Sequence, residues 1–455
     1  MMTVSTDRTP FWPALMGRSK RAMFRLMLAS GFLWPLVRYC TGRIEEVSPS
    51  LSHKSLPTLR ILALNPDRFR GDLEVLAASG QFRIFRAPFR FQTRLLGYFY
   101  PPGVRASIAH QNRDGREARD AFRLFLRPFL RQLYSAMRID CVIGAGHYHQ
   151  DVDWGAVSNE IGVPYIVIHR ENLNASEAMR EEVVRKGKSL GEFSGAHLFV
   201  HVESVRDTWI ESGFVSPDKI SALGALRMDA FVRRIGGKTR PTAECRRVTF
   251  FSFAPGASLL HLNIGPWPSD PDAGFVKFFR NSHIAFGEFA REHPDLDFVI
   301  KPKWGNHWIS EIEMVLRQAG IPPDLSNLTI DATLDVHELI LSSDVVLGFG
   351  STALIEAAVA GKQVIIPFFD EPCEEQYADS VLLRDEFHLF DVARSPAEMK
   401  SLILQNLVAE VAPDLREARW DLFERYVSFA DGTATEKYVD ALTKLIAAHK
   451  QTALV

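Results

Sequence analysis

The sequence has few cysteines and no long hydrophobic run, and each absence excludes a class of protein. The four cysteines are widely spaced and form no CxxC pair or Cys/His cluster. This argues against a disulfide framework and a structural zinc site, and it favours a reducing compartment. The longest uncharged apolar run covers residues 26–37 and contains a proline, whereas a membrane-spanning helix needs about 20 apolar residues. We therefore expect a segment that lies on a membrane surface rather than one that spans it.

Acidic residues are scarce in the first third of the chain. Residues 1–135 hold 22 Lys and Arg against 9 Asp and Glu, although the 455-residue chain as a whole carries a net charge of only −2. Such an asymmetry indicates that one part of the molecule meets a polyanion or an anionic membrane. No nucleic-acid recognition signature accompanies the charge, so we expect no nucleic-acid partner.

Three basic segments interleave arginines with aromatic residues and leucines, namely 11–39, 83–94 and 122–134. This pattern is typical of helices that bury apolar side chains among lipid headgroups, with each basic side chain adding about 1 kcal/mol near an anionic leaflet. The alternative is that they are core helices whose exposed faces are basic. We expect residues 1–58 to form a basic amphipathic segment, and the protein to be cytoplasmic and peripheral at the inner face of the cell membrane.

From residue 59 onward, strand-like and helix-like segments alternate, and the pattern occurs twice. The first series predicts strands at 59–65, 82–88, 140–146, 163–169, 196–202 and 219–225. After a polar stretch at 239–246, a second series predicts strands at 247–256, 297–303, 328–332, 344–347 and 363–366. Such alternation is typical of parallel sheets covered by helices on both faces. We expect an α/β protein with two tandem Rossmann-like, doubly wound domains at 59–238 and 247–430, a ligand cleft between them, and a closing helix at 431–455.

The segment 344–367, DVVLGFGSTALIEAAVAGKQVIIP, predicts a strand, a glycine turn, a short helix and a second strand. Gly350 allows a tight turn, and Ser351 or Thr352 is placed to cap the helix. Free backbone N–H groups at the positive end of a helix form an anion site suited to a phosphate. The sequence therefore predicts phosphate binding at this turn.

Glu356 is the single charged residue of this helix. It shares a helical face with Thr352, and its other neighbours from 353 to 360 are all apolar. An unpaired carboxylate in such a helix would be costly. The two hydroxyls of a ribose would satisfy it; the alternative is a structural partner such as an arginine from a neighbouring element.

These residues resemble a known family. Segment 344–367 is similar to the C-terminal donor-binding motif of GT-B glycosyltransferases, above all bacterial CDP-glycerol glycerophosphotransferases and capsule or lipopolysaccharide transferases. Segments 219–231, 297–303, 337–344 and 429–442 are similar to further motifs of that group and follow in the same order. The resemblance implies an acceptor domain first and a nucleotide-donor domain second.

The resemblance also implies roles for individual residues. Ser351 and Thr352 would hold the donor phosphate and Glu356 the ribose, while Lys301 would lie near the diphosphate. Gly350, Lys303 and Arg227, the last in the G-x-x-R-x-D segment, complete the expected donor site. Where the family has His-Pro, this chain has Lys303 and a tryptophan. A lysine balances leaving-group charge but cannot act as an imidazole acid.

Two loops of the first domain carry candidates for a general base. The first, 144–154, holds His147, His149 and Asp151, with Asp151 and His149 the leading candidates. The second follows the next predicted strand and holds Glu171. For each residue the alternative is a loop hydrogen bond or a helix cap. Clustered His and Asp could also bind metal, but the resemblance implies an enzyme without metal or cofactor.

The sequence thus predicts a bacterial cell-envelope transferase. It would move a sugar or a polyol phosphate from a nucleotide-activated donor to a surface polysaccharide or lipid-linked acceptor. One alternative is an isomerase like UDP-N-acetylglucosamine 2-epimerase, because HREN at 169–172 is similar to a string in those enzymes. The other is a GT-B scaffold without catalytic activity.

Overall fold

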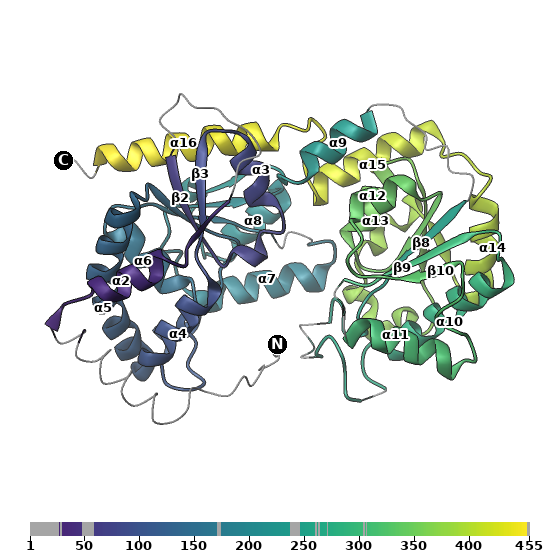
Figure 1. Cartoon of the computed structure of the whole chain (residues 1–455). Coiled ribbons are helices and arrows are strands. Elements are labelled where there is room, and N and C mark those ends of the chain that lie inside the picture. Colours follow the sequence, from purple (N-terminus) through teal and green to yellow (C-terminus); the bar gives the residue numbers. More distant parts are fainter. Residues whose placement is uncertain are drawn as a thin grey trace. The chain divides into compact units, whose positions relative to one another are not determined.

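The computed structural model describes residues 27, 30–47, 59–170, 174–236, 246–259, 262, 264–270, 272–303, 305 and 307–452. These form two compact units (Figure 1). The N-terminal unit holds the described residues up to 170, those from 184 to 229, and those from 431 onward. The C-terminal unit holds residues 174–183 and the described residues from 230 to 430. Each unit contains one sheet, and each is Rossmann-like, as the sequence predicts.

The N-terminal sheet has the strand order β1-β3-β2-β4-β5-β6-β7. Its strands are β1 (Glu45–Glu46), β2 (Leu59–Leu64), β3 (Phe82–Arg86), β4 (Cys141–Gly144), β5 (Tyr165–Ile168), β6 (His197–Val200) and β7 (Ile220–Ala222). All pair in parallel except β1, which pairs antiparallel with β3 at the edge. The six strands expected from the first series are all present. The two-residue strand β1 is too short to leave a pattern in the sequence.

The helices of this unit are α2 (Trp34–Thr41), α3 (Asp72–Ala78), α4 (Phe89–Phe99), α5 (Arg113–Met137), α6 (Val152–Glu160) and α8 (Glu203–Glu211). Two further helices pass from one unit to the other: α7 (Glu177–Leu190) belongs to the C-terminal unit up to residue 183, and α9 (Met228–Gly236) belongs to it from residue 230. The long helix α5 is capped by Asn112, whose side chain accepts a hydrogen bond from the Gly115 N–H. Its phenylalanines and leucines at helical spacing are buried, among them Phe122 and Phe129. The basic 122–134 segment is therefore an amphipathic helix with its apolar face packed inward.

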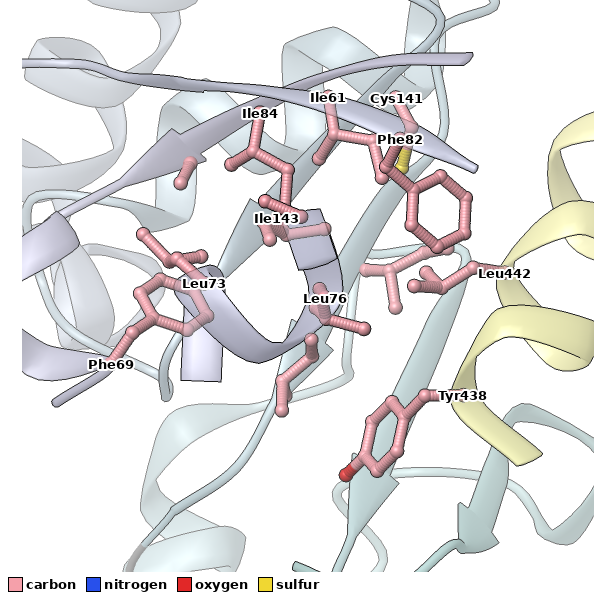
Figure 2. Close-up of a cluster of buried hydrophobic side chains, with 14 of the residues drawn as sticks. Ile61, Phe69, Leu73, Leu76, Phe82, Ile84, Cys141, Ile143, Tyr438 and Leu442 are labelled. Carbon is pink, nitrogen blue, oxygen red and sulfur yellow. The ribbon is translucent and has the colours of Figure 1, made fainter. Parts of the chain in front are cut away.

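The closing helix α16 (Ala434–Thr452) belongs to the N-terminal unit and lies beside α3 (Figure 1). Tyr438 and Leu442 pack into the same apolar cluster as Ile61 and Ile143 (Figure 2). Both oxygens of Asp229 accept backbone hydrogen bonds from the first turn of α16, from Ala434 at 3.0 Å and Thr435 at 2.6 Å. The end of the chain therefore completes the core of the first sheet.

The C-terminal sheet is parallel throughout, in the order β10-β9-β8-β11-β12-β13. Its strands are β8 (Arg247–Phe251), β9 (Asp297–Lys301), β10 (Leu328–Ile330), β11 (Val345–Gly348), β12 (Gln363–Pro367) and β13 (Asp391–Ala393). Its helices are α10 (Val276–Glu292), α11 (His307–Gln318), α12 (Val336–Ser342), α13 (Thr352–Val359), α14 (Pro396–Asn406) and α15 (Pro413–Tyr426). Strand β13 was not expected from the sequence.

The expectations about membrane-spanning helices and cysteines can be compared with the structure. No helix in the described ranges is both long enough and apolar enough to cross a membrane. Cys40, Cys141 and Cys373 are free thiols, and Cys245 lies outside the described residues. Most of the predicted segment 11–39 also lies outside them, apart from the residues that lead into and form α2.

Candidate functional site

The segment from β11 to α13 has the strand, glycine turn and helix expected from the sequence, and phosphate binding at this turn remains a prediction. Gly350 adopts a left-handed conformation with φ of 61°. Ser351 is the helix cap, because its Oγ accepts a hydrogen bond from the Ala353 N–H at 3.3 Å. Thr352 is the first residue of α13. The free N–H groups and the positive end of α13 are therefore presented at the carboxyl edge of the sheet, where ligands of such sheets bind.

A second loop, which follows β8, lies against this turn. A Cβ atom at Gly350 would lie 3.5 Å from the Ser258 hydroxyl. Ser258 itself has a φ of 67°, which is rare for a residue other than glycine. Within the same loop, a Cβ at Gly256 would come 1.9 Å from the Gly265 carbonyl oxygen, so only glycine fits there. Ser258 was not expected from the sequence, although the glycine that follows the first strand of the second series was a signal for a loop at this position.

Glu356 is 4% exposed and has a protein partner. Its Oε2 lies 3.3 Å from Nε2 of His337 on α12. The His337 ring in turn stacks on Phe231 of α9, with ring centroids 4.3 Å apart. The alternative weighed for this carboxylate, a structural partner, is therefore present, and it is a histidine rather than an arginine. The ribose role remains a prediction, and it now involves a carboxylate that His337 orients.

Lys301 is the last residue of β9, and Lys303 follows it at the same edge of the sheet. Lys301 is 7% exposed, and its Nζ donates a hydrogen bond to the Ala332 carbonyl at 2.8 Å. Burial lowers the pKa of Lys301, and Asp331 and Asp335 partly oppose that shift. Lys303 is exposed. Of the two lysines, Lys303 is the more exposed to solvent.

In the N-terminal unit, the two histidines proposed as bases lie in the loop after β4 and have different surroundings. His147 packs edge-on against Phe214, with ring centroids 4.7 Å apart, and burial lowers its pKa to about 3. It is therefore neutral at physiological pH. His149 is the more exposed of the two side chains. Partial loss of solvent around its ring, together with the positive charge of Arg105, lowers the pKa of His149.

Asp151 is fully buried at the start of α6. The amide of Gln92 donates to its Oδ1 at 2.5 Å, and Oδ2 has no hydrogen-bond partner in the described part of the chain. Burial raises the pKa of Asp151 to about 7, which suits a general base, although Gln92 and Arg68 lower it in part. Its neighbour Asp153 is taken up by hydrogen bonds from Tyr100 and Arg123.

Arg227 lies in the N-terminal unit, whereas Gly350, Ser351, Thr352, Glu356 and the two lysines lie in the C-terminal unit. It follows β7, near the buried residues Asp72 and His201. The expected donor residues are thus divided between the two units. Glu171 lies outside the described residues. No group of three His, Cys, Asp or Glu that could hold a metal is found where the structure describes the chain.

No protein-family model matches the sequence, and no curated protein matches it. Solved structures similar to the chain include UDP-GlcNAc 2-epimerase from Neisseria meningitidis bound to UDP-GlcNAc, at 13% identity and a TM-score of 0.45, over 85% of this chain and 99% of that one. A putative UDP-N-acetylglucosamine 2-epimerase from Listeria monocytogenes matches at 12% identity and a TM-score of 0.48, over 85% and 96%. The wall teichoic acid polymerase TagF matches at 11% identity and a TM-score of 0.45, over 70% and 76%.

Both kinds of enzyme have the GT-B fold that the sequence resemblance predicts. The fold class of this chain follows from its own two sheets, in which every neighbouring pair of strands except β1 and β3 is parallel. The structural matches, with TM-scores below 0.5, are too distant to establish it. The likeness does not distinguish between the two reactions.

Proposed function

We propose that the protein transfers a sugar or a polyol phosphate from a nucleotide-activated donor to a surface polysaccharide or a lipid-linked acceptor. The observation that carries this proposal is the turn at Gly350 and Ser351, with the buried Glu356 one helical turn behind it. A phosphate at the start of a helix and a carboxylate in reach of ribose hydroxyls are the two contacts that a nucleotide needs.

The proposed reaction assigns separate tasks to the two units. In the C-terminal unit, the N–H groups of α13 and the Ser258 hydroxyl hold the donor phosphates, and Lys303 balances the charge that develops on the leaving nucleotide. The acceptor hydroxyl attacks the donor, the bond to the nucleotide breaks, and the nucleotide leaves with the electron pair. A base in the N-terminal unit takes the hydroxyl proton, with His149 the exposed candidate and Asp151 the buried one. No step in this scheme requires a metal or a cofactor.

A membrane-surface location is part of the proposal, supported by the outer face of α2 and α5. Phe32, Trp34 and Tyr39 are 60%, 54% and 41% exposed, and Leu124 on α5 is 67% exposed. A groove of about 510 Å³ runs between the two helices and is lined by Trp34, Val37, Arg38, Thr41, Arg131, Gln132, Ser135 and Ala136. Its lining carries two arginines and no acidic residue, which favours an anionic lipid surface.

The proposed function is tested by incubating the purified protein with UDP-, CDP- and CMP-activated donors. We expect slow donor hydrolysis without acceptor, and transfer when a lipid-linked or glycan acceptor is added. The reaction should persist after chelation of divalent metals. Conversion of UDP-GlcNAc to an epimer would favour the isomerase alternative. If the protein bound no nucleotide, the alternative of a scaffold without catalytic activity would be favoured.

A further inference from the structure

A cluster of polar residues lies at the carboxyl edge of the N-terminal sheet. Its buried members are Asp72 at the start of α3, His201 after β6 and Tyr438 on α16. Its half-buried members are Arg170 after β5 and Arg227 after β7. These elements are far apart in sequence, and the parallel sheet brings their ends together. The carboxyl edge of such a sheet is where ligands bind.

Only part of this cluster is satisfied by the protein. Nε of Arg170 lies 2.8 Å from Oδ2 of Asp72, and its Nη1 donates to the Arg68 carbonyl at 2.8 Å. Three other buried polar atoms have no hydrogen-bond partner among the residues described: Oδ1 of Asp72, Nη1 of Arg227 and Oη of Tyr438. Buried polar groups are normally paired, so three such atoms in one cluster point to a missing ligand.

The charges of the cluster favour an anion. Arg170 and Arg227 face a single carboxylate, Asp72, whose pKa burial raises above its usual value although Arg170, Arg227 and Arg70 oppose the shift. His201 is neutral, because burial and the same two arginines hold its pKa well below the usual value. One arginine is therefore matched by Asp72, and the other has no counter-ion within the cluster. A guanidinium nitrogen buried without a partner, such as Nη1 of Arg227, is unfavourable, and a bound anion would relieve it.

The three unpartnered atoms also differ in kind. Arg227 Nη1 and Tyr438 Oη are donors, whereas Asp72 Oδ1 is an acceptor when ionised. Figure 2 shows the Tyr438 hydroxyl pointing away from the labelled side chains Leu76 and Leu442. A ligand that satisfies all three carries an anionic group next to a hydroxyl.

We propose that this cluster, defined by Asp72, Arg170, Arg227 and Tyr438, binds a hydroxylated phosphate ester of the acceptor. The phosphate accepts hydrogen bonds from Arg227 and Tyr438, and the hydroxyl donates to Asp72. The inference rests on the proposed transferase function, for which it narrows the acceptor to a polyol- or sugar-phosphate class. It makes Arg227 an acceptor residue rather than a donor residue.

The test is calorimetric titration of the full chain with glycerol 3-phosphate, and with glycerol and inorganic phosphate as separate probes. We expect glycerol 3-phosphate to bind at least tenfold more tightly than inorganic phosphate, and glycerol alone not to bind. Arg227→Gln should weaken glycerol 3-phosphate binding by at least tenfold, and Tyr438→Phe by a few-fold. Tyr438→Phe keeps the ring in the core, so it separates loss of the hydroxyl from loss of folding.

The matched control is Arg206→Gln, because Arg206 is an arginine of the same unit that pairs with Glu203 and Asp207 at the surface of α8. It should leave binding unchanged. Equal binding by the wild type, Arg227→Gln and Tyr438→Phe would overturn the inference. Equal affinity of the wild type for glycerol 3-phosphate and inorganic phosphate would also overturn it, because the site would then not recognise the hydroxyl group. Loss of nucleotide binding would refute the proposed function without affecting this titration.

Discussion

Glu356 is a carboxylate inside an otherwise apolar helix, and it contacts His337. Because His337 is a neighbour on α12, the carboxylate is oriented before any ligand arrives. A ribose would then meet a fixed acceptor and not a mobile side chain, which lowers the entropy lost on binding.

Glu356→Gln should weaken nucleotide binding without unfolding the protein. The amide keeps the shape of the side chain but loses a charge-assisted hydrogen bond to ribose, which contributes about 1.5–3 kcal/mol, so Kd should rise about tenfold to a hundredfold. Calorimetric titration with the preferred nucleotide measures this. Glu313→Gln is the control, because Glu313 pairs with Arg317 on the surface of α11 in the same unit. Unchanged affinity in Glu356→Gln would remove the ribose role.

Asp151→Asn should make the protein more stable relative to the wild type at high pH than it does at low pH. The pKa of Asp151 is about 7 in the folded protein and about 3.9 when unfolded, so the folded state binds the proton more tightly. Wild-type stability therefore falls between about pH 4 and pH 7, by at most about 4 kcal/mol. Asparagine does not titrate and escapes this loss.

Thermal unfolding of both proteins at pH 5 and pH 8 measures the effect of Asp151→Asn. The difference in Tm between variant and wild type should move in favour of the variant at pH 8. An identical difference at both pH values would mean that Asp151 titrates normally. Transfer assays on the same variant then show whether a buried carboxyl serves as the base.

Among the secondary-structure elements, α16 depends on a residue 205 positions earlier in the chain. Asp229 supplies the carboxylate that caps its first turn, and the helix contributes Tyr438, Leu442 and Ile446 to the core of the N-terminal unit. The G-x-x-R-x-D segment and the closing helix, noted separately in the sequence, thus form one structural contact.

Asp229→Ala should destabilise the N-terminal unit by about 0.5–2 kcal/mol, the usual range of loss when a helix cap is removed. Hydrogen exchange should accelerate first at the amides of Ala434 and Thr435, and then along α16. Asp440→Ala is the control, because Asp440 makes only a surface pair with Lys444 on the same helix. Equal exchange in both variants would show that Asp229 is not a cap.

At the scale of the whole molecule, the described residues of the basic first third of the sequence all lie in the N-terminal unit. The exposed aromatic residues of α2 and the arginines that line the groove with α5 all belong to the N-terminal unit. The buried face of α5 explains part of the Arg-aromatic pattern as core packing. The exposed face is what a membrane would contact.

Liposome flotation tests this contact. Recovery with vesicles containing anionic phosphatidylglycerol should exceed recovery with neutral phosphatidylcholine vesicles, and should fall as salt is raised. Trp34→Ser and Arg38→Gln should each lower recovery several-fold. Leu404→Ser, at an exposed apolar side chain of the C-terminal unit, should not. Equal recovery with neutral and anionic vesicles would refute the electrostatic part of the proposal.

The sequence by itself determined the local structure and its periodicity. The apolar runs between turn residues predicted the longer strands of both sheets, and the glycine turn with its serine cap predicted the start of α13, because caps and strand patterns depend on neighbouring residues. The two-residue β1 and the short β13 were missed because they are defined by their partners.

Only the tertiary structure decided which distant side chains meet. It paired Glu356 with His337, brought Ser258 to the glycine turn, capped α16 with Asp229 and grouped Arg227 with Asp72. Each of these contacts joins elements separated by other strands and helices. Their partners are selected by the order of strands in the sheet, which no local pattern of residues encodes.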